Sequence, residues 1–352
     1  MLRLAKTQGY VPDIVMEAMS QVIIEVAYGE EIWKRSGKML SEYNHEIMHL
    51  AEIGLFNVWA VDFVHILRFI PSWVPGATFK RIGERSTWLS DFIRYKPFEM
   101  VKELYSSGQI GQSMASDLLE EFGPNGDVQD ALAVLYTAGS ETTRGAISSF
   151  LYNIFLFPEV ADKVFKEIQH VTNGQRLLHI SDRPSLTYTE AVWKESIRWK
   201  PFFTLGIPHV NSEEEIIQGF RIPKGTVIGQ NIGFMLIDPK VWGDPEIFRP
   251  ERFLSQSNNG AEACLPNPSI VVFGFGSRIC PGMQLADRAG FHIAATMASL
   301  YHILPLDGKE RPDPAMAAYT DMPIRVPADF HATFAPRDLK AAYLLKTLSL
   351  DG

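Results

Sequence analysis

One stretch near the middle of the chain constrains the fold most. Residues 127–156 contain no proline, and apolar side chains recur through them almost without interruption. We predict a single helix of about 30 residues, about 45 Å long at a rise of about 1.5 Å per residue. Because a helix that is apolar on most sides has to be surrounded by other elements, the sequence predicts a mainly helical protein with this helix at its centre.

Helical periodicity and chain breakers predict the remaining elements. Helical segments are expected at 12–70, 80–122, 158–171, 188–199 and directly after Cys280, with the turn PSWVPG between the first two. Short hairpin strands are expected in EEIIQGFRIPKGTVIGQNI, where Gln218-Gly219 marks a turn. A proline-rich irregular stretch covers 238–268. The predicted fold class is mainly α with small β-sheets.

Charge and cysteine content exclude several functions. The chain has 33 basic and 41 acidic residues and a net charge of −8, without a basic run, which argues against binding to nucleic acid. Its two cysteines, Cys264 and Cys280, argue against a disulfide scaffold, and neither has a C-x-x-C partner for zinc.

Residues 53–76 are the most lipid-like part of the chain, but charged side chains interrupt them. They fall short of the roughly 18 apolar residues that a membrane span needs, and we recognise no signal peptide. We expect a helix with a core-facing stripe formed by Trp59, Phe63, Ile66 and Ile70. A helix lying on the protein surface is the alternative, and membrane contact through 53–76 stays open.

The ten residues FGFGSRICPG, 273–282, surround Cys280 with glycine and proline. Cys280 is expected at the start of a helix, where free N–H groups and the helix dipole favour a thiolate. Gly276 and Gly282 remove side chains on either side of the sulfur, and Arg278 adds a cation suited to a carboxylate. A buried structural thiol or a simple anion-binding loop is the alternative interpretation.

The full pattern F-x-x-G-x-R-x-C-x-G, filled by Phe273, Gly276, Arg278, Cys280 and Gly282, is expected by chance in roughly one chain in ten thousand or fewer. It resembles the haem-ligand signature of the cytochrome P450 monooxygenases. The resemblance implies that the Cys280 thiolate is the proximal ligand of the iron of haem b and favours O–O cleavage. It also implies that Arg278 contacts a haem propionate.

Three further segments are similar to P450 elements in the expected order. KESIRW and FRPERF look like the family's E-x-x-R and P-E-R-F elements, which implies a structural triad of Glu195, Arg198 and Arg252. His209, in GIPHV, matches a position that contacts a propionate in many members; a loop histidine without a ligand is the alternative.

AGSETT, residues 138–143, resembles the family's oxygen-activation box. The resemblance implies that Ala138 and Gly139 leave room for dioxygen beside the haem. Thr142 can bond to the carbonyl four residues earlier. With Glu141, it would form a catalytic pair that relays protons to dioxygen.

By the same resemblance, an apolar substrate pocket is expected on the long helix, in the loop PFFTLG and in the turn near residue 322. The residues are Val134, Leu135, Phe202, Phe203, Thr204 and Met322, each of which could equally be core packing.

The resemblance is specific from Gly126 to Arg337. It implies one P450 domain over 1–352, with substrate-side helices in 1–122, a haem-binding core in 123–337 and a tail in 338–352. We find no counterpart of the family's membrane anchor, proline-rich hinge or helix C. The expectation is therefore the C-terminal two-thirds of a P450 fold, at the endoplasmic reticulum surface but without an anchor of its own.

The implied function is that of a fungal-type haem-thiolate monooxygenase. It would insert one oxygen atom from O2 into an apolar small molecule, with electrons from NADPH through an NADPH-cytochrome reductase. A non-catalytic, truncated form that binds haem poorly is the main alternative. A haem-thiolate isomerase or dehydratase is a third possibility, and the intact AGSETT box argues against it.

Overall fold

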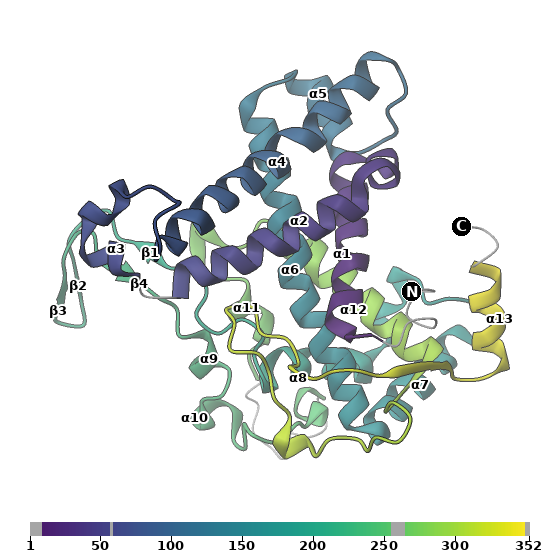
Figure 1. Cartoon of the computed structure of the whole chain (residues 1–352). Helices are drawn as coiled ribbons and strands as arrows, with labels where there is room; N and C mark the ends of the chain where they lie inside the picture. Colours follow the sequence, from purple (N-terminus) through teal and green to yellow (C-terminus); the bar gives the residue numbers. More distant parts are fainter. Residues whose placement is uncertain (1–8, 57–58, 255–264, 349–352) are drawn as a thin grey trace. The chain divides into compact units, whose positions relative to one another are not determined.

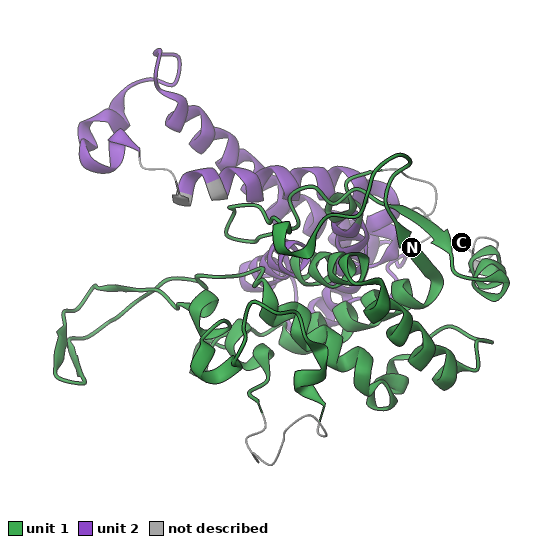
Figure 2. Cartoon of the chain, turned by 90° about the horizontal axis from the view of Figure 1, so that it is seen from below, with its two compact units in different colours: residues 1–14, 143–352 green, residues 15–142 purple. Residues whose placement is uncertain are grey.

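The computed structural model describes residues 9–56, 59–254 and 265–348, and within them the chain is mainly helical with three two-stranded sheets (Figure 1). The expected fold class is therefore confirmed. The chain divides into two compact units, coloured in Figure 2: unit 1 comprises residues 1–14 and 143–352, and unit 2 comprises residues 15–142. Cys264 lies outside the described residues.

Unit 2 consists of helices. After α1 (Val11–Tyr28), which begins in unit 1, the elements are α2 (Glu30–Phe56), α3 (Ala60–Phe63), the 3-10 helix η2 (His65–Phe69), α4 (Thr78–Ser106) and α5 (Met114–Phe122). Among the described residues, most of 12–70 and 80–122 is helical as predicted, and the turn between them is confirmed.

Helices α2 and α4 pack through an aromatic cluster. The ring of Tyr43 lies 5.4 Å from Trp88 and 5.1 Å from Phe92, and the two α4 rings stack 5.5 Å apart. Arg85 of α4 adds two hydrogen bonds to the Glu46 carboxylate of α2, at 2.7 and 2.6 Å. Aromatic pairs at these separations contribute about 0.5–1.5 kcal/mol each beyond their burial, so they help to hold the two helices together.

The segment between α2 and α4 corrects one expectation. The predicted core-facing stripe is wrong, because no residue of α3 or η2 is buried, and Phe63 and Ile66 are 75% and 72% exposed. The helix is broken at Val64, whose φ of −111° and ψ of 79° are not helical. These two short helices leave apolar side chains at the surface of unit 2.

The long central helix is confirmed as α6 (Gly126–Leu156), which has 31 residues. Its second half, Thr143–Leu156, belongs to unit 1 and is almost wholly buried there. Its first half belongs to unit 2 and carries an exposed stripe along Ala131, Val134 and Ala138, at spacings of three and four residues. The first half of α6 therefore exposes one face to solvent, whereas the second half is packed.

Unit 1 contains the remaining elements. Its principal helices are α7 (Pro158–Thr172), α8 (Thr187–Trp199), α12 (Met283–Leu300) and α13 (Leu339–Leu348). Its shorter helices are η3 (Ile180–Ser185), α9 (Ile232–Met235), α10 (Pro239–Trp242), η4 (Pro250–Phe253), α11 (Pro268–Val272), η5 (Gly276–Arg278) and η6 (Pro314–Met316). The helices predicted after Pro158, near Tyr188 and after Cys280 are confirmed.

Three antiparallel strand pairs complete unit 1: β1 (His209–Val210) with β4 (Val227–Ile228), β2 (Glu215–Ile217) with β3 (Phe220–Ile222), and β5 (Tyr301–Leu304) with β6 (Thr333–Pro336). Gln218 and Gly219 have φ of 52° and 85°, so both positions of the β2–β3 turn are left-handed. This is the turn chemistry expected from the Gln-Gly dipeptide.

Among the described residues, none of the helices combines the length and apolar character that crossing a bilayer requires.

Candidate functional site

Cys280 lies in a loop whose shape is set by backbone bonds and a glycine. Helix α11 ends at Val272, and the backbone N–H of Cys280 donates to the carbonyl of Phe273 at 2.8 Å, which closes the loop. Gly276 has a φ of 62°, a left-handed conformation that costs an L-residue about 1–2 kcal/mol. The motif glycine at 276 is therefore required by the turn itself.

The Cys280 thiol sits just before α12. It is a free cysteine of intermediate burial, three residues ahead of Met283, where α12 begins. The N-cap residue Gly282 offers no side-chain cap, and the backbone N–H of Met283 donates to the Cys280 carbonyl at 3.3 Å. This placement agrees with the position expected from the sequence.

Gly282 differs from Gly276. Its φ of −82° is open to every residue, and a Cβ built there would meet only the Cys280 sulfur, at an ordinary 3.8 Å. Neither backbone strain nor protein packing therefore explains the glycine. A side chain at residue 282 would instead occupy the space beside the sulfur.

The outer surface of the loop is apolar with one cation. Phe275 and Ile279 are 44% and 43% exposed, and Arg278 is exposed and pairs with no acidic residue in the part of the chain that the structure describes. A thiol, two apolar side chains and a guanidinium on one loop suit a flat, largely apolar ring that carries carboxylates. The residues therefore fit haem. His209, on β1, is exposed opposite Ile228 and lies outside this loop.

Glu195, Arg198 and Arg252 form one buried cluster in unit 1. Arg198 donates Nε and Nη2 to the Glu195 carboxylate at 2.8 and 2.9 Å, and Arg252 donates Nε to Oε1 at 3.1 Å. All three side chains are at most 2% exposed. Burial lowers the pKa of the Arg252 guanidinium, and Glu195 opposes that shift.

The cluster also fixes the irregular segment after residue 235. Arg198 donates to the carbonyl of Leu236 at 3.2 Å, and Arg252 donates to those of Trp242 and Ile247 at 2.7 and 3.0 Å. These carbonyls complement the second guanidinium, which the single carboxylate of Glu195 does not neutralise. A segment with little regular structure is thereby held by side chains, since buried backbone groups need partners.

The AGSETT residues lie on α6 within or at the edge of unit 2. Thr142 Oγ1 donates to the Ala138 carbonyl at 2.8 Å, the back-bond anticipated from its position. Ala138 and Thr142 continue the stripe of Ala131 and Val134, whereas the Glu141 side chain is only 3% exposed. A Cβ at Gly139 would lie 3.3 Å from Ile23 of α1, so close helix packing accounts for this glycine.

The expected substrate-pocket residues fall into two groups. In unit 1, Phe203 forms a β-bridge with Ile324, and the carbonyl of Phe202 accepts from Arg325 at 2.7 Å, so this loop adjoins the segment that carries Met322. Phe202 is buried, while Phe203, Thr204 and Met322 are partly exposed. In unit 2, Val134 is 66% exposed and Leu135 partly so.

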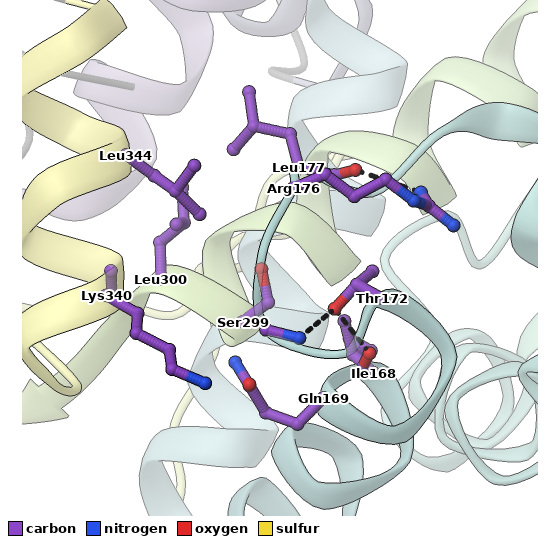
Figure 3. Close-up of a pocket in the computed structure, with 11 residues that line it drawn as sticks. Ile168, Gln169, Thr172, Arg176, Leu177, Ser299, Leu300, Lys340 and Leu344 are labelled. Carbon is purple, nitrogen blue, oxygen red and sulfur yellow. Dashed lines mark hydrogen bonds between the residues drawn. The ribbon is translucent and has the colours of Figure 1, made fainter.

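A small pocket elsewhere in unit 1 contains none of the expected site residues. Figure 3 shows it between α7, α12 and α13, with Thr172, Ser299 and Lys340 in its wall. Thr172 Oγ1 donates to Ile168 at 2.8 Å and accepts from Gly174, so its hydroxyl is already bonded.

The sequence did not reveal two polar arrangements. Arg183 joins Glu190 of α8 at 2.9 Å to Asp287 of α12 at 2.7 Å, and Trp193 also donates to Asp287. In unit 2, His45 Nδ1 lies 3.5 Å from Glu141 Oε1. Neither arrangement has a local motif, because Asp287 lies 104 residues after Arg183 and His45 lies far from Glu141 along the chain.

A thiol at a helix start on a glycine-shaped, apolar loop defines a site of the haem-thiolate class. The cytochrome P450 family model matches residues 2–324, and the chain belongs to this family. Family membership implies haem.

Curated relatives include fungal enzymes. Cytochrome P450 monooxygenase 208 of Postia placenta is 31% identical over 340 residues, covering 95% of this chain and 65% of the relative. O-methylsterigmatocystin oxidoreductase of Aspergillus flavus is 33% identical over 94% of this chain and 62% of the relative. COX2 of Coprinopsis cinerea, a cytochrome P450 monooxygenase, is 33% identical over 83% of this chain and 57% of the relative. The chain thus spans less than two-thirds of the length of these relatives.

Proposed function

We propose that this chain carries the haem-thiolate site of a monooxygenase that inserts one oxygen atom from O2 into an apolar organic substrate. The carrying observation is Cys280, a free, partly buried thiol ahead of α12, beside a glycine that protein packing does not require. Electrons would come from NADPH through an NADPH-cytochrome reductase.

Four residues of the Cys280 loop would each have a role toward the cofactor. The Cys280 sulfur would coordinate the iron, since the start of a helix stabilises a thiolate. Arg278 would pair with a propionate, and Phe275 and Ile279 would cover the ring and exclude water. When bound, the haem would supply the activation of dioxygen.

Two residues of α6, Thr142 and Glu141, would relay protons. Thr142 keeps its hydroxyl on the helix through its bond to Ala138, and that oxygen can still accept a second hydrogen bond. Glu141, the neighbouring carboxyl, can hold a proton and pass it on. Val134 and Ala138, on the same open stripe, would present an apolar wall to the substrate.

The test is reconstitution with haem, a reductase, NADPH and ¹⁸O-labelled dioxygen, using coumarin, whose hydroxylated product would carry the label, as the apolar probe. Hydroxycoumarin formed in step with NADPH consumption, and lost in Cys280→Ser, is the expected result. Bound haem without NADPH-dependent product would instead favour the non-catalytic alternative.

A second proposal concerns the surface of unit 2. We propose that Phe63, Ile66, Phe69 and Trp73 touch the endoplasmic reticulum membrane, because they are 70–80% exposed and close together along the chain. Lys80 and Arg81 hold this segment by donating to the carbonyls of Arg68 and Ser72 at 2.8 Å, and they add positive charge. Exposed apolar patches flanked by cations are typical of membrane-surface contacts.

Sedimentation with phosphatidylcholine vesicles, with and without phosphatidylserine, tests this contact. Phe63→Ser with Trp73→Ser should reduce the bound fraction. Ile216→Ser with Phe220→Ser, which removes two equally exposed apolar side chains from the β2–β3 hairpin, should leave it unchanged. An equal decrease of the vesicle-bound fraction in the two double variants would contradict the proposal.

A further inference from the structure

Glu141 has a partner on a different helix. His45 of α2 places Nδ1 3.5 Å from Glu141 Oε1, and both residues belong to unit 2. The two side chains differ sharply in exposure: Glu141 is 3% exposed and His45 is 50% exposed. The pair therefore joins a buried carboxyl to a group that water reaches.

The chemistry of the two groups suits proton exchange. Histidine is the side chain whose ordinary pKa lies in the neutral range, so it gains and loses a proton near pH 7. A buried carboxyl has few direct routes to solvent, and a proton that leaves it must be replaced through a neighbour. At 3.5 Å, a small rotation of the imidazole ring brings the two atoms into direct hydrogen-bond contact.

We propose that His45 is a positioning residue that supplies protons from solvent to Glu141. The inference rests on the proposed function, in which Glu141 passes protons on. In the step, the Nδ1–H bond of the imidazolium breaks and an O–H bond forms on Glu141. His45 then takes a proton from water, so protons balance and no electrons move.

Several titratable groups lie around the pair. On α6 and α1, burial raises the pKa of Tyr136 and Tyr28, so both stay neutral. On α2, Glu42 and His49 lie within one turn of His45. Glu46 of the same helix is occupied by Arg85 of α4, in a bidentate ion pair.

The first test is the pH profile of product formed per NADPH in His45→Gln, His45→Lys and the control His170→Gln, an exposed histidine of α7. In the wild type, coupling should fall as pH rises through the neutral range, because the imidazolium is lost. His45→Gln should lower coupling about tenfold and remove this dependence. His45→Lys keeps the positive charge through this range and should restore coupling with a flat profile. His170→Gln should match the wild type.

The second test does not depend on turnover. Histidine ring resonances of the haem-supplied protein, in its diamagnetic reduced carbon monoxide form, are followed by NMR as a function of pH. Replacing Glu141 by Gln removes the carboxylate that favours the imidazolium, so the titration midpoint of His45 should fall. The midpoint of His170 should not move.

The outcomes separate the two proposals. If the wild type turns over and the pH profile of coupling is unchanged in His45→Gln, only the role of His45 is contradicted. The same holds if the titration midpoint of His45 is unchanged in Glu141→Gln. Absence of turnover in the wild type contradicts the proposed function, and the role of His45 falls with it.

Discussion

Glu195 of α8 and Arg252 of η4, 57 residues apart in sequence, share a buried hydrogen bond of 3.1 Å between Nε and Oε1. The same carboxyl oxygen accepts the backbone N–H of Arg249 at 2.8 Å. One carboxylate thus holds two guanidiniums and a loop backbone, and the segment Leu236–Arg252 depends on it.

Replacing this carboxylate should destabilise unit 1 severely. Glu195→Gln leaves two buried guanidiniums without their counter-charge, and removing one partner of a buried ion pair costs about 3–5 kcal/mol. That is a large part of the roughly 5–15 kcal/mol that stabilises a typical domain. Chemical denaturation and soluble yield of the full chain measure the effect.

Glu214→Gln is the matched control for Glu195→Gln. Glu214 also pairs with an arginine, Arg221, at 2.8 Å, but both side chains are exposed on the β2–β3 hairpin. Solvent screens such a pair, so stability should barely change. Similar losses in the two variants would show that the buried cluster has no special role.

Substitutions at the two motif glycines should have different effects, one on folding stability and the other on ligand binding. Gly276→Ala forces alanine into a φ of 62° and should lower the free energy of unfolding by about 1–2 kcal/mol. Gly282→Ala meets no such strain, so its stability without haem should stay near that of the wild type. Haem titration should nevertheless show weaker binding, because the new methyl lies 3.8 Å from the sulfur. Unchanged haem affinity in Gly282→Ala would remove the ligand-based explanation of this glycine.

Thr142→Ala should leave haem content intact and divert electrons to peroxide. The change removes the hydroxyl that would pass protons but only one bond within α6. Thr137→Ala is the control, since Thr137 makes the same back-bond to Ala133 at 2.9 Å. Product and peroxide per NADPH are measured in both. Equal product yields in the two variants would count against the proton role of Thr142.

Stability should rise with pH through the slightly acidic range because of His292 on α12. Burial lowers the pKa of His292, His179 lowers it further, and Asp182 opposes them. Below the ordinary value of about 6.5, the unfolded chain therefore binds more protons than the folded one, and stability falls as pH decreases. Denaturation at several pH values should give a flatter dependence for His292→Gln, with His170→Gln as the control. An unchanged slope in His292→Gln would mean that another group controls it.

Local patterns predicted much of the fold because their physical causes are local. The absence of proline and the apolar pattern in 127–156 were enough to predict α6, and Pro158 marked the start of α7. The core-facing stripe at 53–76 was wrong because helical spacing alone does not reveal the break at Val64.

Less of the site could be predicted from the sequence, because much of it depends on contacts between segments far apart in the chain. The Cys280 motif predicted a thiol ahead of a helix, and the Glu195 and Arg252 motifs indicated a cluster only through their resemblance to family elements. Gly139 was interpreted through dioxygen, whereas its neighbour is Ile23, more than a hundred residues earlier. The pairing of His45 with Glu141 has no sequence pattern, because it depends on how α2 packs in unit 2.

Binding of haem iron by the Cys280 thiolate can be measured from the carbon monoxide difference spectrum of the reduced, haem-supplied protein. We expect the strongly displaced Soret band of a thiolate-ligated haem, and its loss in Cys280→Ser, because a serine hydroxyl is a poor donor at neutral pH. A wild-type spectrum without that band, or the same band in Cys280→Ser, would contradict binding of the iron through Cys280.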